Sequence, residues 1–214
     1  MKKVFIAMMF AGITAFSAQA QFNIGIRAGL NATGVHGDAV PVFDESSSVK
    51  SKSGFQVGVV GEYSVSENFV IQPGLLFATQ GFINSRTIEK EKFEINWNLN
   101  YLQIPVNAMY KFGSGKTKFY LQAGPYLGYA LGGKWIGELT SDGKVVESDE
   151  EKIKFGSNDM KRLDFGIGFG LGLQISAVQI GLGYQYGLMN ICNSSELDMK
   201  NDCLAFTVSY IFGK

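Results

Sequence analysis

Apolar residues alternate with glycine or polar residues along most of this chain, and this period of two limits the possible folds more than any other feature. Residues 165–173 read Phe-Gly-Ile-Gly-Phe-Gly-Leu-Gly-Leu, and residues 178–186 alternate Val, Ile, Leu and Tyr with Gln and Gly. Successive side chains of a β-strand point to opposite faces, which gives this period. Glycine at every second position would cost a helix roughly 1 kcal/mol each relative to alanine. The pattern predicts an all-β chain.

Eight such segments follow one another, and the connections between them alternate in length. The segments are residues 22–31, 55–63, 71–77, 102–112, 119–131, 165–173, 178–186 and 204–212. The short connections are 64–68, 113–118 and 176–177, and the long ones are 32–54, 81–96, 132–161 and 189–202. The long connections carry most of the charge. Short turns at one end and long loops at the other are typical of outer-membrane barrels.

The composition of the second face indicates which side of the strands is apolar. That face is largely Gly, Gln, Asn and Tyr, with too few charges for a solvated surface. The large apolar residues therefore face lipid, and the chain folds as a closed eight-stranded antiparallel up-and-down transmembrane β-barrel, in which every backbone group is paired. Such a barrel is only wide enough for side chains to fill it. We expect the inward glycines of residues 165–186 to face large inward groups such as Tyr101, Tyr120, Tyr126 and Arg27. Pro73, Pro105 and Pro125 lie within strands, where we expect bulges or widened ladder positions.

The first twenty residues have the three parts of a secretory signal peptide. Lys2 and Lys3 precede an apolar run over residues 4–16, and small residues follow at Ala18 and Ala20. This predicts cleavage between Ala20 and Gln21, which leaves residues 21–214 as one barrel domain. Nineteen basic side chains balance nineteen acidic ones, so the net charge does not favour nucleic acid.

Taken together, these segments resemble the PorT-type family of outer-membrane β-barrels, which are related in architecture to OmpX and to the OmpA barrel. The matching pieces are FNIGIRAGLN (22–31), IQPGLLFATQG (71–81), YLQIPV (101–106), LQAGPYLGY (121–129), DFGIGFGLGL (164–173) and IGLGYQYG (180–187). The resemblance implies residence in the outer membrane but not one shared activity.

Four ionisable residues fall on the inward face of the expected strands. They are Arg27, Glu62, Lys111 and Asp164. Arg27 and Glu62 lie on neighbouring strands and could form an ion pair inside the barrel. The alternative is that these charges line a path for an ion or solute, although an eight-stranded barrel leaves no open channel once its side chains are placed.

Two groups of reactive side chains lie in the long connections. His36, Asp38 and the serines at 46–48 could serve a catalyst at the outer rim, but no spacing signature supports this. Glu147, Asp149, Glu150 and Glu151 could bind a cation such as Ca²⁺, but the ordered spacing of a calcium loop is absent and lysines flank them. We expect no catalytic residue, metal or cofactor.

The long connections themselves carry β-patterns. Apolar residues are odd-numbered over 93–99 and even-numbered from Leu102, and this phase slip near Tyr101 predicts a bulge. Residues 134–140 and 144–147 flank Ser141-Asp142-Gly143, which predicts a hairpin. The strands should therefore extend beyond the bilayer.

Cys192 and Cys203 are expected to form a disulfide. They flank the last long connection, at the facing outer ends of the seventh and eighth strands, and secretion places them in an oxidising compartment. Two unbonded thiols are the alternative, because sequence cannot establish the register.

These features predict a monomeric, non-enzymatic barrel that is surrounded by outer-membrane lipid. It would stabilise the cell envelope, or contact an envelope or secretion-machinery protein through its long loops. The alternatives are a narrow channel or carrier for small solutes and, less favoured, an enzyme with its active site at the rim.

Overall fold

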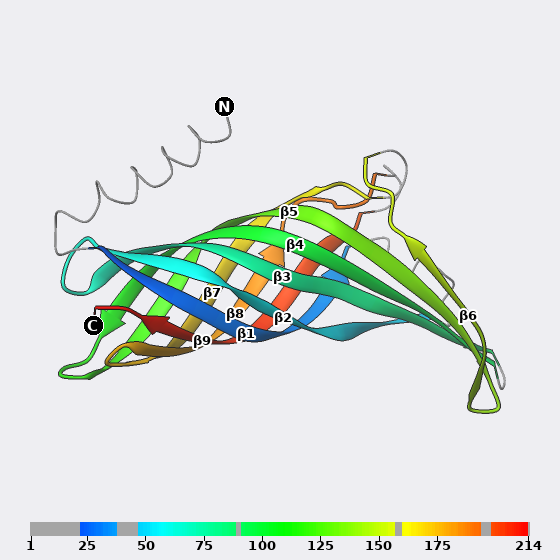
Figure 1. Cartoon of the computed structure of the whole chain (residues 1–214), viewed down its shortest axis with the longest axis horizontal. Helices are drawn as coiled ribbons and strands as arrows, with labels where there is room; N and C mark the ends of the chain where they lie inside the picture. Colours follow the sequence, from blue (N-terminus) through cyan, green and yellow to red (C-terminus); the bar gives the residue numbers. More distant parts are fainter. Residues whose placement is uncertain (1–21, 38–46, 89–90, 157–159, 194–197, 214) are drawn as a thin grey trace.

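The computed structural model describes residues 22–37, 47–88, 91–156, 160–193 and 198–213, and these form an antiparallel β-barrel (Figure 1). The strands are β1 (Phe22–His36), β2 (Ser47–Ser64), β3 (Phe69–Ile88), β4 (Glu91–Phe112), β5 (Thr117–Ser141), β6 (Lys144–Lys152), β7 (Leu163–Ile175), β8 (Val178–Gly187) and β9 (Lys200–Ile211). The order β4-β3-β2-β1-β9-β8-β7-β5 closes through pairing of β4 with β5, and β6 pairs with β5 outside the ring. The predicted eight-stranded barrel is confirmed, with one further strand.

The N-terminal segment, including the predicted signal peptide and its cleavage site at Ala20 and Gln21, lies outside the described residues. Within the described part of the chain, no helix is long and apolar enough to cross a membrane.

Large apolar side chains cover the outside of the ring. Leu30, Phe169 and Leu171 are each more than half exposed, whereas Glu62 and Asp164 are fully buried inside. Exposed aromatic residues form a girdle near each end of this band: Tyr63, Phe69, Tyr110, Phe112, Phe119, Tyr210 and Phe212 at one end, and Phe55, Tyr129, Phe165 and Tyr186 at the other. This inversion of the usual core and surface suits a barrel surrounded by lipid.

The short connections lie at one end of the barrel and the long ones at the other (Figure 1). The β2–β3, β4–β5 and β7–β8 turns and the C-terminus share the left end of the view, where barrels of this kind face the periplasm. At the opposite end β3, β4 and β5 continue far beyond the ring. They have 20, 22 and 25 residues, against the roughly 9–11 that a strand needs to cross a bilayer.

The prolonged strands form a curved sheet, which we call the outer extension. It consists of residues 47–51, 82–88, 91–100, 132–141 and 144–152. β5 and β6 join through Asp142 and Gly143, whose φ angles of 47° and 77° are the two positive values of a tight hairpin turn. The predicted hairpin is confirmed, and its second strand runs on to Lys152.

A register shift lies where the sequence predicts a bulge, but the extra residue is on the other strand. Asn100 pairs with Gly132 and Tyr101 with Ala130, so Leu131 of β5 is the additional residue. In β4 the odd-numbered residues keep facing inward from Leu99 to Lys111. The apolar residues change sides because the surroundings change: lipid lies outside the barrel wall, whereas water lies outside the extension.

The prolines within strands do not produce bulges. Pro73 pairs with Val106, Pro105 with Tyr126 and Pro125 with Ile167, in registers that remain the same on both sides. Direct pairing skips positions next to Pro73 and Pro105 and then resumes. A missing N–H therefore interrupts the ladder without shifting it.

Candidate functional site

A hydrogen-bonded network of polar side chains crosses the barrel near its short-turn end. Glu62 Oε1 accepts hydrogen bonds from Lys111 Nζ at 2.7 Å, Gln179 Nε2 at 2.6 Å and Gln72 Nε2 at 3.2 Å. Lys111 Nζ also donates to Gln174 Oε1 at 2.8 Å. All five side chains are buried. The buried charges of Glu62 and Lys111 thus compensate each other, and the network fills this part of the bore.

Arg27 joins this network, but it does not form the ion pair with Glu62 that the sequence had suggested. Its Nε donates to Ser209 Oγ at 2.9 Å and its NH2 donates to Gln72 Oε1 at 2.5 Å. Arg27 stands opposite Gly58, whereas Glu62 stands opposite Asn23, four residues before Arg27 in β1. The expected pairing is wrong because this offset leaves Gln72 to bridge the two charged groups.

A second polar layer surrounds Asp164 closer to the long-loop end. Asp164 Oδ2 accepts hydrogen bonds from Asn201 Nδ2 at 3.0 Å and from the Tyr126 hydroxyl at 3.4 Å. Asn201 Nδ2 also donates to the Tyr101 hydroxyl at 3.3 Å. None of these four side chains is more than 2% exposed.

The inward glycines make room for two of the large side chains that we expected opposite them. A Cβ atom on Gly166 would lie 2.6 Å from Cε1 of Tyr126, and one on Gly181 would overlap the Tyr120 hydroxyl. The expectation holds for Tyr120 and Tyr126. Arg27 is not among the near neighbours of these glycines, because it lies against β3 and β9.

An apolar cluster covers the barrel at its outer mouth. Its buried members are Phe82, Leu99, Tyr101, Ala130, Ile153, Met160, Ile191, Cys192 and Met199. Five of these members, Ile153, Met160, Ile191, Cys192 and Met199, come from the long connections. Below this cluster, the described side chains leave a cavity of about 50 Å³ in the bore, next to Arg27, Gln122 and Tyr126. Apart from this cavity, the network around Glu62, the polar layer around Asp164 and the apolar cluster fill the bore.

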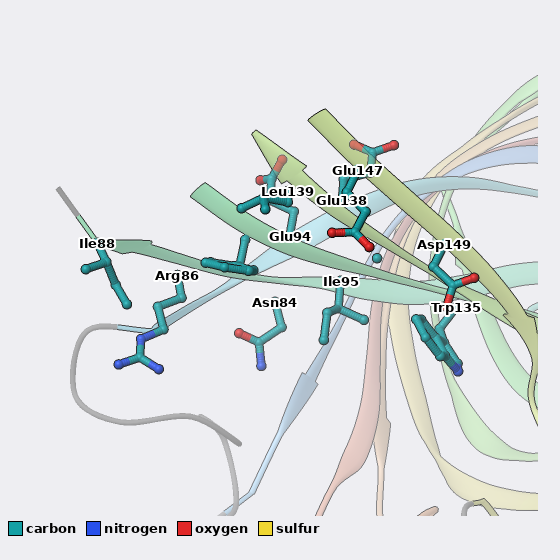
Figure 2. A pocket seen from close by; sticks show the side chains of 12 residues that line it. Asn84, Arg86, Ile88, Glu94, Ile95, Trp135, Glu138, Leu139, Glu147 and Asp149 are labelled. Atoms are coloured by element: carbon teal, nitrogen blue, oxygen red, sulfur yellow. The ribbon is translucent and has the colours of Figure 1, made fainter. Parts of the chain in front are cut away.

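An apolar hollow outside the bore lies on the outer extension (Figure 2). It has a volume of about 530 Å³, and we call it the outer groove. Asn84, Arg86, Ile95 and Trp135 point to the same side of the sheet, as Figure 2 shows. The register explains this, because Asn84 pairs with Ile95 and Ile95 with Gly137, so these positions share one face.

Opposite charges border the outer groove. Arg86 stands on β3, and Glu147 and Asp149 stand on β6, three strands away. Neighbouring strands lie about 4.8 Å apart, so roughly 14 Å separates the two charged sides. Between them the floor is formed by Phe93, Ile95, Trp135 and Leu139. The sequence revealed the alternation of residues 93–99, but not that β5 and β6 would complete the surface.

The acidic residues considered for cation binding do not converge. β6 directs Glu147, Asp149 and Glu151 to one face and Glu150 to the other. Glu150 forms an ion pair with Lys134 at 2.8 Å. Across the described residues, no three His, Cys, Asp or Glu side chains gather in a way that could hold a metal ion.

The rim residues considered for catalysis are only partly described. Asp38 and Ser46 lie outside the described residues. His36 stacks on Tyr186 with ring centroids 4.1 Å apart, and its Nδ1 lies 3.5 Å from Asp202 Oδ2. Ser48 Oγ instead contacts Ser85 Oγ at 2.8 Å, on β3. His36 and Ser48 therefore engage different neighbours.

The two cysteines are buried thiols that are not joined to each other. The disulfide prediction assumed that they face one another across β8 and β9. Cys203 instead pairs with Gln185 in the β8–β9 ladder, while Cys192 lies beyond the end of β8 and bridges to Met160. The structure therefore does not contain the expected bond.

Comparison with known proteins agrees with this architecture. The model of the outer membrane protein beta-barrel domain family matches residues 17–193. The chain therefore belongs to this family, and it is an integral β-barrel protein of the bacterial outer membrane. No curated protein is similar enough to the chain to match it.

Several solved barrels are similar to this chain. Ail, the attachment invasion locus protein of Yersinia pestis, is 16% identical over 90% of this chain and 99% of its own, with a TM-score of 0.43. Neisserial surface protein A is 14% identical over 87% and 96%, with a TM-score of 0.43. The outer membrane enzyme PagL is 11% identical over 87% and 98%, with a TM-score of 0.42.

Proposed function

We propose that this protein acts without catalysis, by presenting its outer extension to a protein partner at the cell surface. The observation that carries the proposal is the contrast between a bore filled by side chains and an apolar groove of about 530 Å³ outside it. Ile88 and Phe93 in this groove are each more than 40% exposed. Contiguous exposed apolar surface of this kind is typical of interaction sites.

The free edge of β6 could pair with an extended segment of the partner. Among the described strands, β6 pairs with β5 alone, so its other edge offers unpaired backbone groups. A strand added at this edge would extend the sheet, as in other cases of β-strand addition. Glu147, Asp149 and Glu151 on β6 favour basic side chains in such a partner. We include in this proposal that the partner is a component of the cell envelope or of a secretion machinery, as the resemblance to PorT-type barrels suggests.

A photo-crosslinking amino acid in the outer groove tests the proposal. Placed at Leu139, in the groove, it should give a crosslinked product of discrete mass on intact cells. Ile136 lies on the opposite face of the same strand and is the matched control. Equal labelling from both positions, or none from Leu139, would contradict a groove-bound partner.

A narrow channel is the second candidate function. Because the network around Glu62 and the cluster at the outer mouth fill the bore, we expect the purified barrel to give no steady conductance in planar bilayers. Reproducible single-channel steps would favour the channel over the interaction role.

A further inference from the structure

A second hollow lies on the outward wall of the barrel, where β4 and β5 leave the apolar band. It has a volume of about 560 Å³, and we call it the wall cleft. Its polar lining comes from Asn98, Asn100, Lys134, Glu150, Lys152 and Arg162. It is separate from the outer groove, because Asn98 and Lys134 are register partners on the opposite face of the extension.

Positive charge gathers in the wall cleft. Lys134 and Lys152 stand directly opposite each other in the β5–β6 ladder, where like charges destabilise the pairing. Glu150 pairs with Lys134 at 2.8 Å, but both side chains are about half exposed, so this pair contributes little. Three cationic side chains therefore face one carboxylate, and a bound anion would relieve their repulsion.

Lys52 adds to this positive surface from the neighbouring part of the wall. Its Nζ lies 3.5 Å from Asn96 Oδ1, on the same outward face. Burial lowers the pKa of Lys52, and the positive charge of Lys134 lowers it further. Lys52 therefore extends the positive surface from the wall cleft towards β2.

Arg162 is held in position to receive an anion. Its NH1 donates to the carbonyl oxygen of Ala130 at 3.0 Å. Its guanidinium carbon lies 4.8 Å from the ring centre of Phe155 and 5.9 Å from that of Tyr129. A planar guanidinium fixed in this way has its remaining N–H groups arranged for the oxygens of a phosphate.

The wall cleft continues directly into the lipid-facing surface. Leu131 lines the cleft and is half exposed, and Tyr129 and Leu163 lie next to it in the apolar band. A molecule that contacts both surfaces must carry hydrocarbon below and negative charge above. This arrangement selects a membrane lipid rather than a soluble anion.

We propose that the wall cleft binds the phosphorylated head group of a lipid in the outer leaflet. The phosphate lies among Lys134, Lys152 and Arg162. The acyl chains run along Tyr129, Leu131 and Leu163. The side-chain amides of Asn98 and Asn100 donate hydrogen bonds to the sugar or phosphate oxygens of the head group.

Native mass spectrometry of the full barrel tests this proposal, with diphosphorylated lipid A as the probe. We expect wild type to retain the lipid, and the K152Q/R162Q variant to bind it at least about tenfold more weakly. The K144Q/K154Q variant is the control, because it loses the same charge from positions that do not line the cleft. Unchanged gel mobility before boiling verifies that each variant is folded.

Two further probes test whether the cleft recognises the intact phosphorylated lipid, its acyl chains alone or free phosphate alone. Dephosphorylated lipid A should bind wild type as weakly as diphosphorylated lipid A binds K152Q/R162Q, and millimolar inorganic phosphate should not displace the intact lipid. Equal binding by wild type and K152Q/R162Q would overturn the proposal, as would equal loss in both variants. Displacement by inorganic phosphate would assign the cleft to a soluble anion and overturn the lipid assignment.

Discussion

One carboxylate oxygen of Glu62 accepts three hydrogen bonds. Because these bonds share one acceptor, we expect single substitutions in the bore to lower the stability of the barrel. Lys111 supplies the positive charge. Gln72, Gln174 and Gln179 connect the ion pair by hydrogen bonds to β3, β7 and β8. Burying an ion pair costs the desolvation of both groups, so the intact pair contributes little, whereas removing only one partner is strongly destabilising. Charges in this barrel therefore depend on one another.

Replacing Lys111 should test this dependence. We expect Lys111→Met to lower the free energy of unfolding by about 3–5 kcal/mol, because Glu62 is left buried without its cation. The double variant Glu62→Gln/Lys111→Met should recover much of this loss. Urea unfolding of the barrel in liposomes measures both, and Lys116→Met at an exposed turn is the control. A Lys111→Met barrel as stable as wild type would refute the argument.

Tyr120 tests the role of the inward glycines. In Gly181→Ala the new Cβ would overlap the Tyr120 hydroxyl, so we expect a loss of about 1–3 kcal/mol. Tyr120→Phe removes that oxygen and should relieve most of the penalty. Gly183→Ala, on the same face of β8, meets its nearest atom at 3.5 Å and should be close to neutral. Similar unfolding curves for the two alanine variants would contradict this explanation.

At the scale of elements, the stability of the outer extension depends on strand pairing, because this sheet lies beyond the lipid-facing band. β4 is paired on both sides along residues 91–100, whereas β6 has one paired edge among the strands that the structure describes. The β5–β6 hairpin depends on two positive φ angles, and Gly143 adopts the second of them without the strain that a side chain would cause. The order of the extension should therefore decrease from β4 towards β6.

Amide hydrogen exchange can measure this gradient. We expect slow exchange over residues 92–98 and faster exchange over 144–152. Gly143→Val should speed exchange in residues 144–152 and leave residues 92–98 unchanged, because only the hairpin turn is strained. Rapid exchange over both segments in wild type would mean that the extension is not a stable sheet.

At the scale of the whole molecule, the barrel has two unlike ends. One end has short turns and the opposite end carries the extension (Figure 1). The outer groove and the wall cleft lie at this extended end. The bore between these ends is filled by side chains, and we expect the short-turn end to face the periplasm and the extended end to face outwards.

Epitope tags can establish this orientation. A tag inserted between Asp142 and Gly143 should be detected by antibody on intact cells. One inserted at Gly115, in the β4–β5 turn, should be detected only after the outer membrane is permeabilised. The reverse result would invert the proposed orientation, and heat-dependent gel mobility verifies that both tagged barrels fold.

Much of this architecture follows from sequence, because its signals are local. Period-two alternation identifies strands, and the apolar surface is so extensive that only lipid can surround it. The turn at Asp142-Gly143 follows from residues that tolerate positive φ. The change of phase near Tyr101 likewise marks, within one strand, the point where the surroundings change from water to lipid.

The rest depends on which strands become neighbours, and alternation along one strand carries no information about that. The sequence predicts that Arg27, Glu62, Lys111 and Asp164 face inward, but the pairing of Glu62 with Lys111 depends on the stagger of distant strands. Cys203 pairs with Gln185 and Cys192 lies beyond the end of β8, so the two cysteines do not share a rung of the ladder. The outer groove and the wall cleft likewise join residues from three or more strands, so only the closed and extended sheet creates them.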